Sequence, residues 1–334
     1  MSLFLMIIGC IISSLVILLM MFKLLIKFEC IECTSDVCLL GKTALVTGGS
    51  QGIGYDIVLQ LASRGCKVII ASRTVDEGLR KQIIHETKNP DIALEYVDMA
   101  SFKSVRLLAS RLKRSESKLD ILINNAGIGT CLNDATEDGL NRTMQVNHFS
   151  GFLLTHLLVD LLKKSEGARV IFVTSILVYI HTLTRRSVKG FKIYNSLFRS
   201  FDYPNSKFCN IITADMFAKK LKRWNITCNS YQPGVVKTEI FKKSEKNLSN
   251  LFDILLYYSL IPLLIKLSSV KPRVTSQGAI QIAIAKEFEN VTGKFVGRFL
   301  HNVKPRAAYD KQFCEAIWRA SEEIVKLKPE ERLD

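Results

Sequence analysis

The sequence predicts an α/β fold: a doubly wound parallel sheet of about seven strands with helices on both faces, preceded by one transmembrane helix. Two features predict the sheet. Short runs rich in Val, Ile and Leu alternate with stretches of helix length, and these runs are almost continuously apolar, as strands covered on both faces are. A long uncharged stretch at the N-terminus predicts the membrane helix.

The N-terminal stretch has the length and composition of a membrane anchor over residues 2–22. None of its 21 residues carries a charged side chain, and as a helix they span roughly 30 Å, the thickness of the hydrocarbon core. A cleaved signal peptide is the alternative, but the basic n-region and the small-residue cleavage site that it needs are missing. Lys23 and Lys27 follow the stretch, so the positive-inside rule places the rest of the chain in the cytosol.

The charge and cysteine content exclude several classes of protein. There are 46 Lys and Arg against 31 Asp and Glu, but no basic run has interleaved aromatics, so we expect no nucleic-acid partner. The surplus favours membrane lipid with anionic headgroups as a partner. The nine cysteines are scattered and odd in number, unlike those of a disulfide-built luminal protein. Cys30, Cys33 and Cys38 cluster without a nearby histidine, and we expect no metal site.

Seven apolar runs are expected to form the sheet: Thr43–Thr47, Lys67–Ala71, Ala93–Val97, Leu119–Asn124, Arg169–Thr174, Ile226–Gln232 and Lys294–Leu300. Stretches of helix length lie between them, for example Gly54–Ala62, Phe102–Arg114 and Gly139–Leu162. No repeat or linker divides this part of the chain. The expected organisation after the anchor is therefore a juxtamembrane linker over residues 23–40, one domain over residues 41–326 and a polar tail over residues 327–334.

A glycine-rich loop directly follows the first expected strand, in the segment Thr47-Gly-Gly-Ser-Gln-Gly-Ile-Gly54. Between a strand and a helix, glycines permit a tight turn and let a pyrophosphate approach the helix N-terminus. Because both flanking elements are expected here, the loop predicts a dinucleotide site in a Rossmann-type fold. Its candidate cofactor-binding residues are Gly48, Ser50, Gln51, Gly52, Ile53 and Gly54.

Further motifs follow in a fixed order along the domain. They are Asp98 after the third strand, Asn124-Asn-Ala-Gly127 after the fourth, Val146-Asn147 on a helix, Val173-Thr-Ser175 after the fifth strand, Tyr203-Pro-Asn-Ser-Lys207, and Pro233-Gly234 with Val236 and Thr238. Together with the spacing of the glycine loop, this order resembles the short-chain dehydrogenase/reductase family. The resemblance covers roughly residues 40–326.

The resemblance implies a role for each of these positions. Four residues would be catalytic: Asn147, Ser175, Tyr203 and Lys207. Asn147 would hold a water that links Lys207 to solvent, and Tyr203 and Lys207 would also contact the cofactor, Lys207 through the nicotinamide ribose. The remaining cofactor contacts would be Asp98 at the adenine, Asn125, Ala126 and Gly127 at the floor of the site, and Val236 and Thr238 over the nicotinamide.

The residue types suit carbonyl reduction independently of the family. Hydride transfer to a carbonyl leaves negative charge on oxygen, which a nearby acid must protonate. A Lys four residues after a Tyr shares its helix face and is expected to lower the pKa of the phenol. Ser175 can hydrogen-bond the substrate oxygen. For Tyr203 and Lys207 alone an ordinary surface pair is the alternative, and Pro204 indicates that their helix begins at or just before Tyr203.

The residues after the second strand bear on the choice of cofactor. An acidic side chain there binds the ribose hydroxyls of NAD, whereas Arg accommodates the 2′-phosphate of NADP. The chain has Arg73 at this point and no acid before Asp76, so we expect NADP(H). The alternative is that Arg73 is only a solvated loop charge, and Gln51 in the glycine loop is neutral where many NADP-preferring relatives carry a base.

Several segments resemble the retinol dehydrogenase branch of the family. The 27 residues between Ser175 and Tyr203 nearly double the usual interval, and further similar runs are Asp98–Arg106, Val146–Thr155, Thr275–Ala279 and Gly293–Gly297. The resemblance implies a single-pass protein of the endoplasmic reticulum membrane, with its catalytic domain in the cytosol. Its substrate would be a lipophilic alcohol or carbonyl, with retinol/retinal first and a steroid, a fatty aldehyde or an isoprenoid alcohol as alternatives.

Three points stay open in the sequence. The apolar residues 254–265 either lie on the membrane at a hydrophobic substrate entrance or form a core helix. A catalytically silent scaffold that binds NADP(H) is the alternative of another class, although the chain keeps all four catalytic positions. The helices through which the family forms dimers are present, but their faces cannot be read from the pattern, which leaves a homodimer open.

Overall fold

A computed structural model describes residues 33–129, 135–188, 201–234, 272–297 and 303–333 of the chain. The expected anchor at residues 2–22 and the apolar run at residues 254–265 lie outside the described residues. Within the described ranges, no helix combines the length and the apolar character that crossing a bilayer requires.

Seven parallel strands form one sheet in the order β3-β2-β1-β4-β5-β6-β7, which confirms the fold class predicted for the domain. The strands are β1 (Thr43–Thr47), β2 (Lys67–Ser72), β3 (Ile92–Tyr96), β4 (Ile121–Asn124), β5 (Arg169–Val173), β6 (Thr227–Gln232) and β7 (Phe295–Gly297). The chain builds the sheet outward from β1 to β3 and then returns to place β4 on the other side of β1. This reversal creates the switch point at which open α/β sheets bind ligands.

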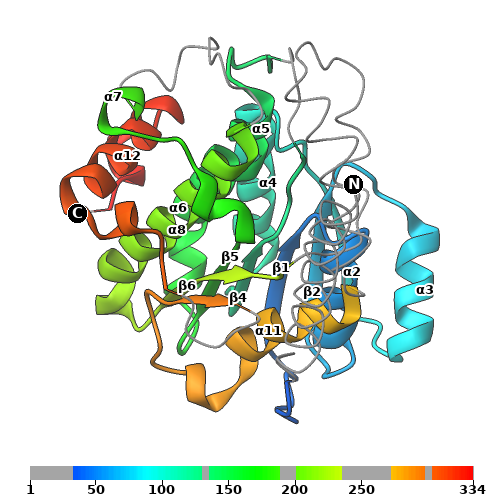
Figure 1. Cartoon of the computed structure of the whole chain (residues 1–334). Helices are drawn as coiled ribbons and strands as arrows, with labels where there is room; N and C mark the ends of the chain where they lie inside the picture. Colours follow the sequence, from blue (N-terminus) through cyan, green and yellow to red (C-terminus); the bar gives the residue numbers. More distant parts are fainter. Residues whose placement is uncertain (1–32, 130–134, 189–200, 235–271, 298–302, 334) are drawn as a thin grey trace, which may run out of the picture.

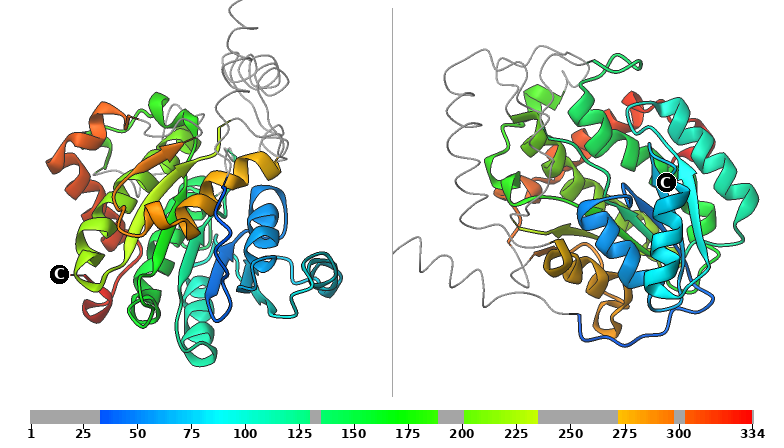
Figure 2. Two further views of the ribbon diagram at one scale, coloured as in Figure 1. Left: turned by 90° about the horizontal axis from the view of Figure 1, so that it is seen from below. Right: turned by 90° about the vertical axis from the view of Figure 1, so that its right-hand side faces the viewer.

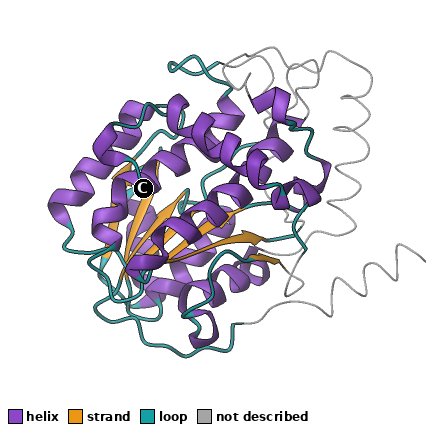
Figure 3. Ribbon diagram, turned by 90° about the vertical axis from the view of Figure 1, so that its left-hand side faces the viewer, coloured by secondary structure: helices purple, strands orange, loops and turns teal. Residues whose placement is uncertain are grey.

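Helices cover both faces of the sheet (Figures 1, 2 and 3). They are α2 (Gly52–Ala62), α3 (Glu77–Thr87), α4 (Phe102–Ser115), α5 (Arg142–Met144), α6 (Ser150–Leu162), α7 (Arg185–Val188), α8 (Asp202–Leu221), α11 (Pro272–Ile284) and α12 (Lys311–Ile324). One core lies between the sheet and α2, α3 and α11, and the other lies between the sheet and α4, α6 and α8. The strands read as continuous apolar runs because both of their faces are buried.

The predicted helix over Gly139–Leu162 begins later than expected and is not a regular α-helix at its start. Asn141 caps the first turn, where its side chain accepts a hydrogen bond from the Met144 amide at 2.9 Å. Between α5 and α6 the chain forms a π-helical turn over Gln145–Phe149. Such turns are rare and are frequent at functional sites, and this one contains Asn147.

Helix α12 covers the outer side of α6 and α8 (Figure 1). Trp318 of α12 meets Phe152 of α6 and Phe217 of α8 edge-on, with ring centroids 4.8 and 5.0 Å apart. Pairs with this geometry each contribute about 0.5–1.5 kcal/mol beyond the area that they bury. Almost every residue of α6 is therefore buried.

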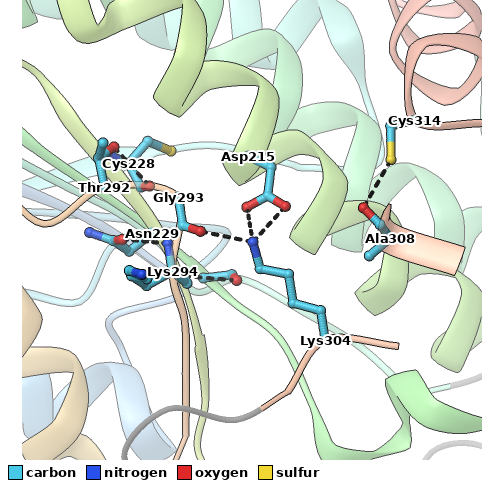
Figure 4. A network of polar contacts seen from close by, with 10 residues as sticks. Asp215, Cys228, Asn229, Thr292, Gly293, Lys294, Lys304, Ala308 and Cys314 are labelled. Carbon is cyan, nitrogen blue, oxygen red and sulfur yellow. Dashed lines mark hydrogen bonds and ion pairs between the residues drawn. The ribbon is translucent and has the colours of Figure 1, made fainter. Parts of the chain in front are cut away.

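Two ion pairs attach the C-terminal part of the chain to the domain. Lys304 lies 2.7 Å from the carboxylate of Asp215 on α8 and donates to the Gly293 carbonyl at 2.8 Å, as Figure 4 shows. Arg106 of α4 bonds Glu331 at 3.0 Å. Leu327 and Leu333 are buried in the same core. These contacts hold the described part of the segment that was expected to be a polar tail against α4.

Candidate active site

The predicted site residues gather at the carboxyl ends of four neighbouring strands. The glycine loop follows β1, residues 125–127 follow β4, Ser175 follows β5 and Gly234 follows β6. In an open parallel sheet this edge is where ligands bind. Val236 and Thr238 lie outside the described residues.

The glycine loop folds so tightly that side chains would obstruct it. Gly48 has φ +66°, and a Cβ there would lie 2.9 Å from the Ala126 Cα. A Cβ at Gly54 would collide with the Gly48 carbonyl oxygen. The loop leads through Ser50 and the extended Gln51 into α2, whose first turn contains Gly52 and Ile53. No side chain caps α2, and its first turn has no acidic residue, so its amides fit the diphosphate of a dinucleotide.

A network of hydrogen bonds joins this loop to the turn after β4. The Thr47 hydroxyl accepts from the backbone amides of Asn125 and Ala126, both at 3.0 Å. The Asn125 side chain donates to the carbonyls of Thr47 at 2.9 Å and Gly48 at 3.1 Å. Asn125 therefore holds the floor of the predicted cofactor site in place, with its amide already engaged by the backbone.

Arg73 and Asp98 flank the same edge of the sheet. Arg73 is exposed just beyond β2 and has no hydrogen-bond or ion-pair partner among the described residues. Asp76, the first acid after β2, caps α3 by accepting from the Gly78 amide at 2.8 Å. The Asp98 carboxylate accepts from the Ala100 amide at 2.9 Å and shapes the turn into α4. Arg73 and Asp98 thus follow the carboxyl ends of β2 and β3, two neighbouring strands of the sheet.

Ser175, Tyr203 and Lys207 come together between β5 and α8. Ser175 caps the short helical turn Ile176–Ile180, and its hydroxyl is hydrogen-bonded to Tyr203. Helix α8 begins at Asp202, so Tyr203 and Pro204 lie in its first turn, as Pro204 predicts. Lys207 follows one turn later, where its Nζ donates to the Val173 carbonyl at 3.0 Å and lies 5.8 Å from the centre of the Tyr203 ring.

Asn147 joins the turn after β4 to α8. Its Oδ1 accepts from the Ile128 amide at 2.8 Å, and its Nδ2 donates to the Ile128 carbonyl at 2.9 Å and to Ser206 Oγ at 3.0 Å. A Cβ at Gly127 would stand 3.1 Å from Lys207 Nζ and 3.4 Å from Asn147 Oδ1. The structure thus brings all four predicted catalytic residues into one buried cluster.

Burial governs the proton affinities of this cluster. It raises the pKa of Tyr203 to about 12, against the opposing effect of the hydrogen bond from Ser175. It lowers the pKa of Lys207 to about 8. The sequence led us to expect a lowered tyrosine pKa, but removal of the phenolate from water outweighs the effect of nearby groups. Tyr203 is therefore a neutral phenol at pH 7 and can donate a proton.

Other residues that hold the site were not found from the sequence. Thr47 and Ser206 bond the predicted residues directly, and Asn210 bonds the main chain of Asn147. Ser206 lies three residues after Tyr203 and Asn210 lies three residues after Lys207, so a helical projection from the two catalytic residues could have found them. Thr47 ends β1 and is the first residue of the glycine-loop segment, but nothing in that pattern indicates its hydrogen bonds to the turn after β4.

Comparison with known proteins identifies the family. The family model described as short chain dehydrogenase matches residues 42–249. This chain belongs to the short-chain dehydrogenase family. It is 35% identical over 298 residues to retinol dehydrogenase 12 of Mus musculus, covering 88% of this chain and 89% of that protein. It is 32% identical over 305 residues to retinol dehydrogenase 13 of Homo sapiens, covering 89% and 88%.

Solved structures agree with the fold of this short-chain dehydrogenase. An uncharacterised protein from Mycobacterium paratuberculosis superposes with a TM-score of 0.67 at 22% identity, over 87% of this chain and 96% of that chain. The NADP active-site complex of Pseudomonas aeruginosa RhlG superposes with a TM-score of 0.59 at 26% identity, over 78% of this chain and 95% of that chain. The family and its retinol dehydrogenase relatives indicate an oxidoreductase that acts on alcohols, and the fold and family imply a nicotinamide cofactor.

Proposed function

We propose that this chain is a membrane-anchored, NADP(H)-dependent oxidoreductase that interconverts a lipophilic alcohol and its aldehyde or ketone, with retinol and retinal as the first candidates. The observation that carries the proposal is the hydrogen-bonded pair of Ser175 and Tyr203 beside Lys207, at the carboxyl end of β5. A steroid, a fatty aldehyde or an isoprenoid alcohol would fit the same chemistry.

The cluster performs the proton chemistry of a carbonyl reduction. When bound, a nicotinamide cofactor supplies the hydride. The Ser175 and Tyr203 hydroxyls bind the carbonyl oxygen, and Tyr203 gives it a proton as negative charge develops there. Lys207, whose pKa burial lowers to about 8, can hold or release a proton near neutral pH. Asn147 fixes the turn after β4 against α8, which keeps Lys207 in place.

Three observations support NADP(H) over NAD(H). Arg73 is exposed directly after β2 and has no side-chain partner among the residues that the structure describes, which leaves its guanidinium available to a 2′-phosphate. Asp76 caps α3, so its carboxylate is engaged away from the ribose hydroxyls. A solved relative at 26% identity is an NADP complex. An arginine at this position is the feature that accommodates the extra phosphate.

The membrane part of the proposal rests on the sequence. The uncharged residues 2–22 and the following lysines favour a single-pass anchor with the domain in the cytosol, and a lipophilic substrate suits the endoplasmic reticulum membrane. Such an anchor would keep the protein in permanent contact with membrane lipid. The face of α6 and α8 is covered by α12 of the same chain, so a homodimer would have to use another face.

The proposal is tested with membrane fractions that contain the full chain. All-trans-retinal is supplied with NADPH or with NADH, and a Tyr203→Phe variant serves as control. We expect retinol with NADPH, product formation at least about tenfold slower with NADH, and a loss of about 10²-fold or more in the variant.

Other outcomes would change the proposal in defined ways. If NADPH is oxidised with a steroid or fatty carbonyl but not with retinal, the proposed mechanism stands and the proposed substrate changes. Tight NADPH binding with no reaction across a broad carbonyl panel would instead favour the silent scaffold.

A further inference from the structure

Three buried side chains form a chain of hydrogen bonds that starts at the main chain of Asn147 and ends on α12. The Asn210 Nδ2 donates to the Asn147 carbonyl at 2.8 Å. The Asn210 Oδ1 lies 3.2 Å from His148 Nδ1, and His148 Nε2 lies 2.9 Å from Ser321 Oγ. Asn210 is 1% exposed, and His148 and Ser321 are fully buried.

The acceptor at one end fixes the direction of every bond in this chain. A backbone carbonyl can only accept, so the Asn210 amide must present its nitrogen to Asn147 and its oxygen to His148. His148 must then carry its proton on Nδ1. Its bare Nε2 then accepts the one proton of the Ser321 hydroxyl, which is directed to His148 in preference to the competing Ile317 carbonyl 2.8 Å away. Bonds that all point one way strengthen one another in a low-dielectric interior.

The chain of hydrogen bonds reaches the catalytic cluster at the π-helical turn. Asn147 lies in the π-helical turn Gln145–Phe149, so the usual α-helical pattern does not fix its carbonyl. The Asn147 side chain is held separately, by Ile128 in the turn after β4 and by Ser206 on α8. Asn147 is thus held between the turn after β4 and the two helices α8 and α12.

We propose that Asn210 and His148 are positioning residues of the reaction: they hold the π-helical turn so that Asn147 stays against Ile128 and beside Lys207. This inference rests on the proposed function, because it assigns a task relative to the catalytic cluster. It also makes α12 part of the support of the active site, through Ser321. Displacements of about 1 Å at a catalytic group can cost about 10²-fold in rate.

Helix α6, which follows the π-helical turn, contains a matched control. His156 is also buried, at 4% exposure. Among the described residues its ring bonds the Phe152 carbonyl at 3.0 Å and packs on Phe217 and Trp318. Its Nε2 has no hydrogen-bond partner among the described residues. His156 therefore contributes to the same core without any bond toward Asn147.

The kinetic test compares substitutions at these positions in the full chain. Asn210→Leu and His148→Leu are expected to lower kcat by about 10- to 100-fold while KM for NADPH stays within about twofold. His148→Asn keeps an N–H donor where Nδ1 stood and is expected to recover most of kcat. His156→Leu is expected to lower Tm about as much as His148→Leu does, but to leave kcat within about twofold of the wild-type value. Equal kcat in wild type, Asn210→Leu and His148→Leu would overturn the proposal.

A second measurement needs no activity at all. Nitrogen chemical shifts of ¹⁵N-histidine in the full chain report which ring nitrogen carries the proton, and the chain has five histidines, so His148→Asn assigns the signal. We expect the Nδ1–H tautomer at pH 7. The Nε2–H tautomer would overturn the inference even if the enzyme is active. An inactive wild type with the Nδ1–H tautomer would instead count against the proposed function and leave the hydrogen-bond chain supported.

Discussion

Gly127 lies so close to Lys207 that a Cβ at position 127 would stand 3.1 Å from the ammonium nitrogen. The same Cβ would stand 3.4 Å from Asn147 Oδ1. A glycine at this position therefore leaves room for both side chains. It is not required by the backbone conformation, since its φ is not in the left-handed region.

Gly127→Ala is expected to lower kcat by about tenfold, because the added methyl group must displace Lys207 or Asn147 by a few tenths of an ångström. Tm should change little, because the backbone conformation suits alanine. Steady-state kinetics with NADPH and the best carbonyl substrate, together with a thermal melt, measure both effects. An unchanged kcat would show that Lys207 tolerates the shift.

Reduction and oxidation should respond differently to pH. Tyr203, with its pKa raised by burial to about 12, stays protonated and able to donate through neutral pH. Oxidation needs the phenolate as a base, and its population rises roughly tenfold per pH unit below the pKa. The rate of alcohol oxidation should therefore climb from pH 7 to 9. The rate of carbonyl reduction should stay level and fall above pH 8 as Lys207 loses its proton.

The buried Lys207 ammonium should lower the free energy of unfolding, although the residue is needed for catalysis. Burial lowers its pKa from 10.5 to about 8, so between these values the unfolded chain binds more protons and the free energy of unfolding rises with pH. Lys207→Met should abolish activity and raise stability at pH 7 by about 1–2 kcal/mol, with a smaller gain at pH 10. Thermal melts at the two pH values measure the difference, and a gain that grows with pH would contradict the assignment.

The ion pair of Lys304 and Asp215 should stabilise the attachment of the chain after β7. Both side chains are largely buried, at 15% and 16% exposure. Lys304→Met leaves the Asp215 carboxylate without its partner and should cost about 3 kcal/mol. Burial already raises the pKa of Asp215, so acidification should lessen this cost by protonating the carboxyl. Asp215→Asn in the Lys304→Met background should restore part of the stability in denaturant unfolding.

Arg73→Glu should reverse the preference for cofactor. A glutamate would repel the 2′-phosphate and could bind ribose hydroxyls, so KM for NADPH should rise by about 10- to 100-fold while KM for NADH falls. Lys81→Glu makes the same charge change at an exposed position of α3 and serves as control. If both variants raise KM for NADPH equally, the effect is one of net charge only.

The sheet could be read from the sequence because its strands are buried on both faces, so β1 and β5 stand out as short apolar runs between helices. The π-helical turn at Asn147 could not, since the following helix α6 is buried on almost every side and its apolar pattern therefore has no face from which a shift of one residue could be read. The raised pKa of Tyr203 also escaped prediction, because it depends on how completely the side chain is covered. The bond between His148 and Ser321 joins residues 173 positions apart, which no local pattern reports.

The contacts of α12 also set an order of events during synthesis. Ser321 emerges 173 residues after its partner His148. Ribosomes add about 5–20 residues per second, so the aromatic side of α6 waits on the order of 10–30 s for its cover. For most of that interval the first five strands are available to pair, while Phe152 and its neighbours lack the cover of α12. A chaperone that binds apolar helices would find its target on the nascent chain and lose it when Trp318 arrives.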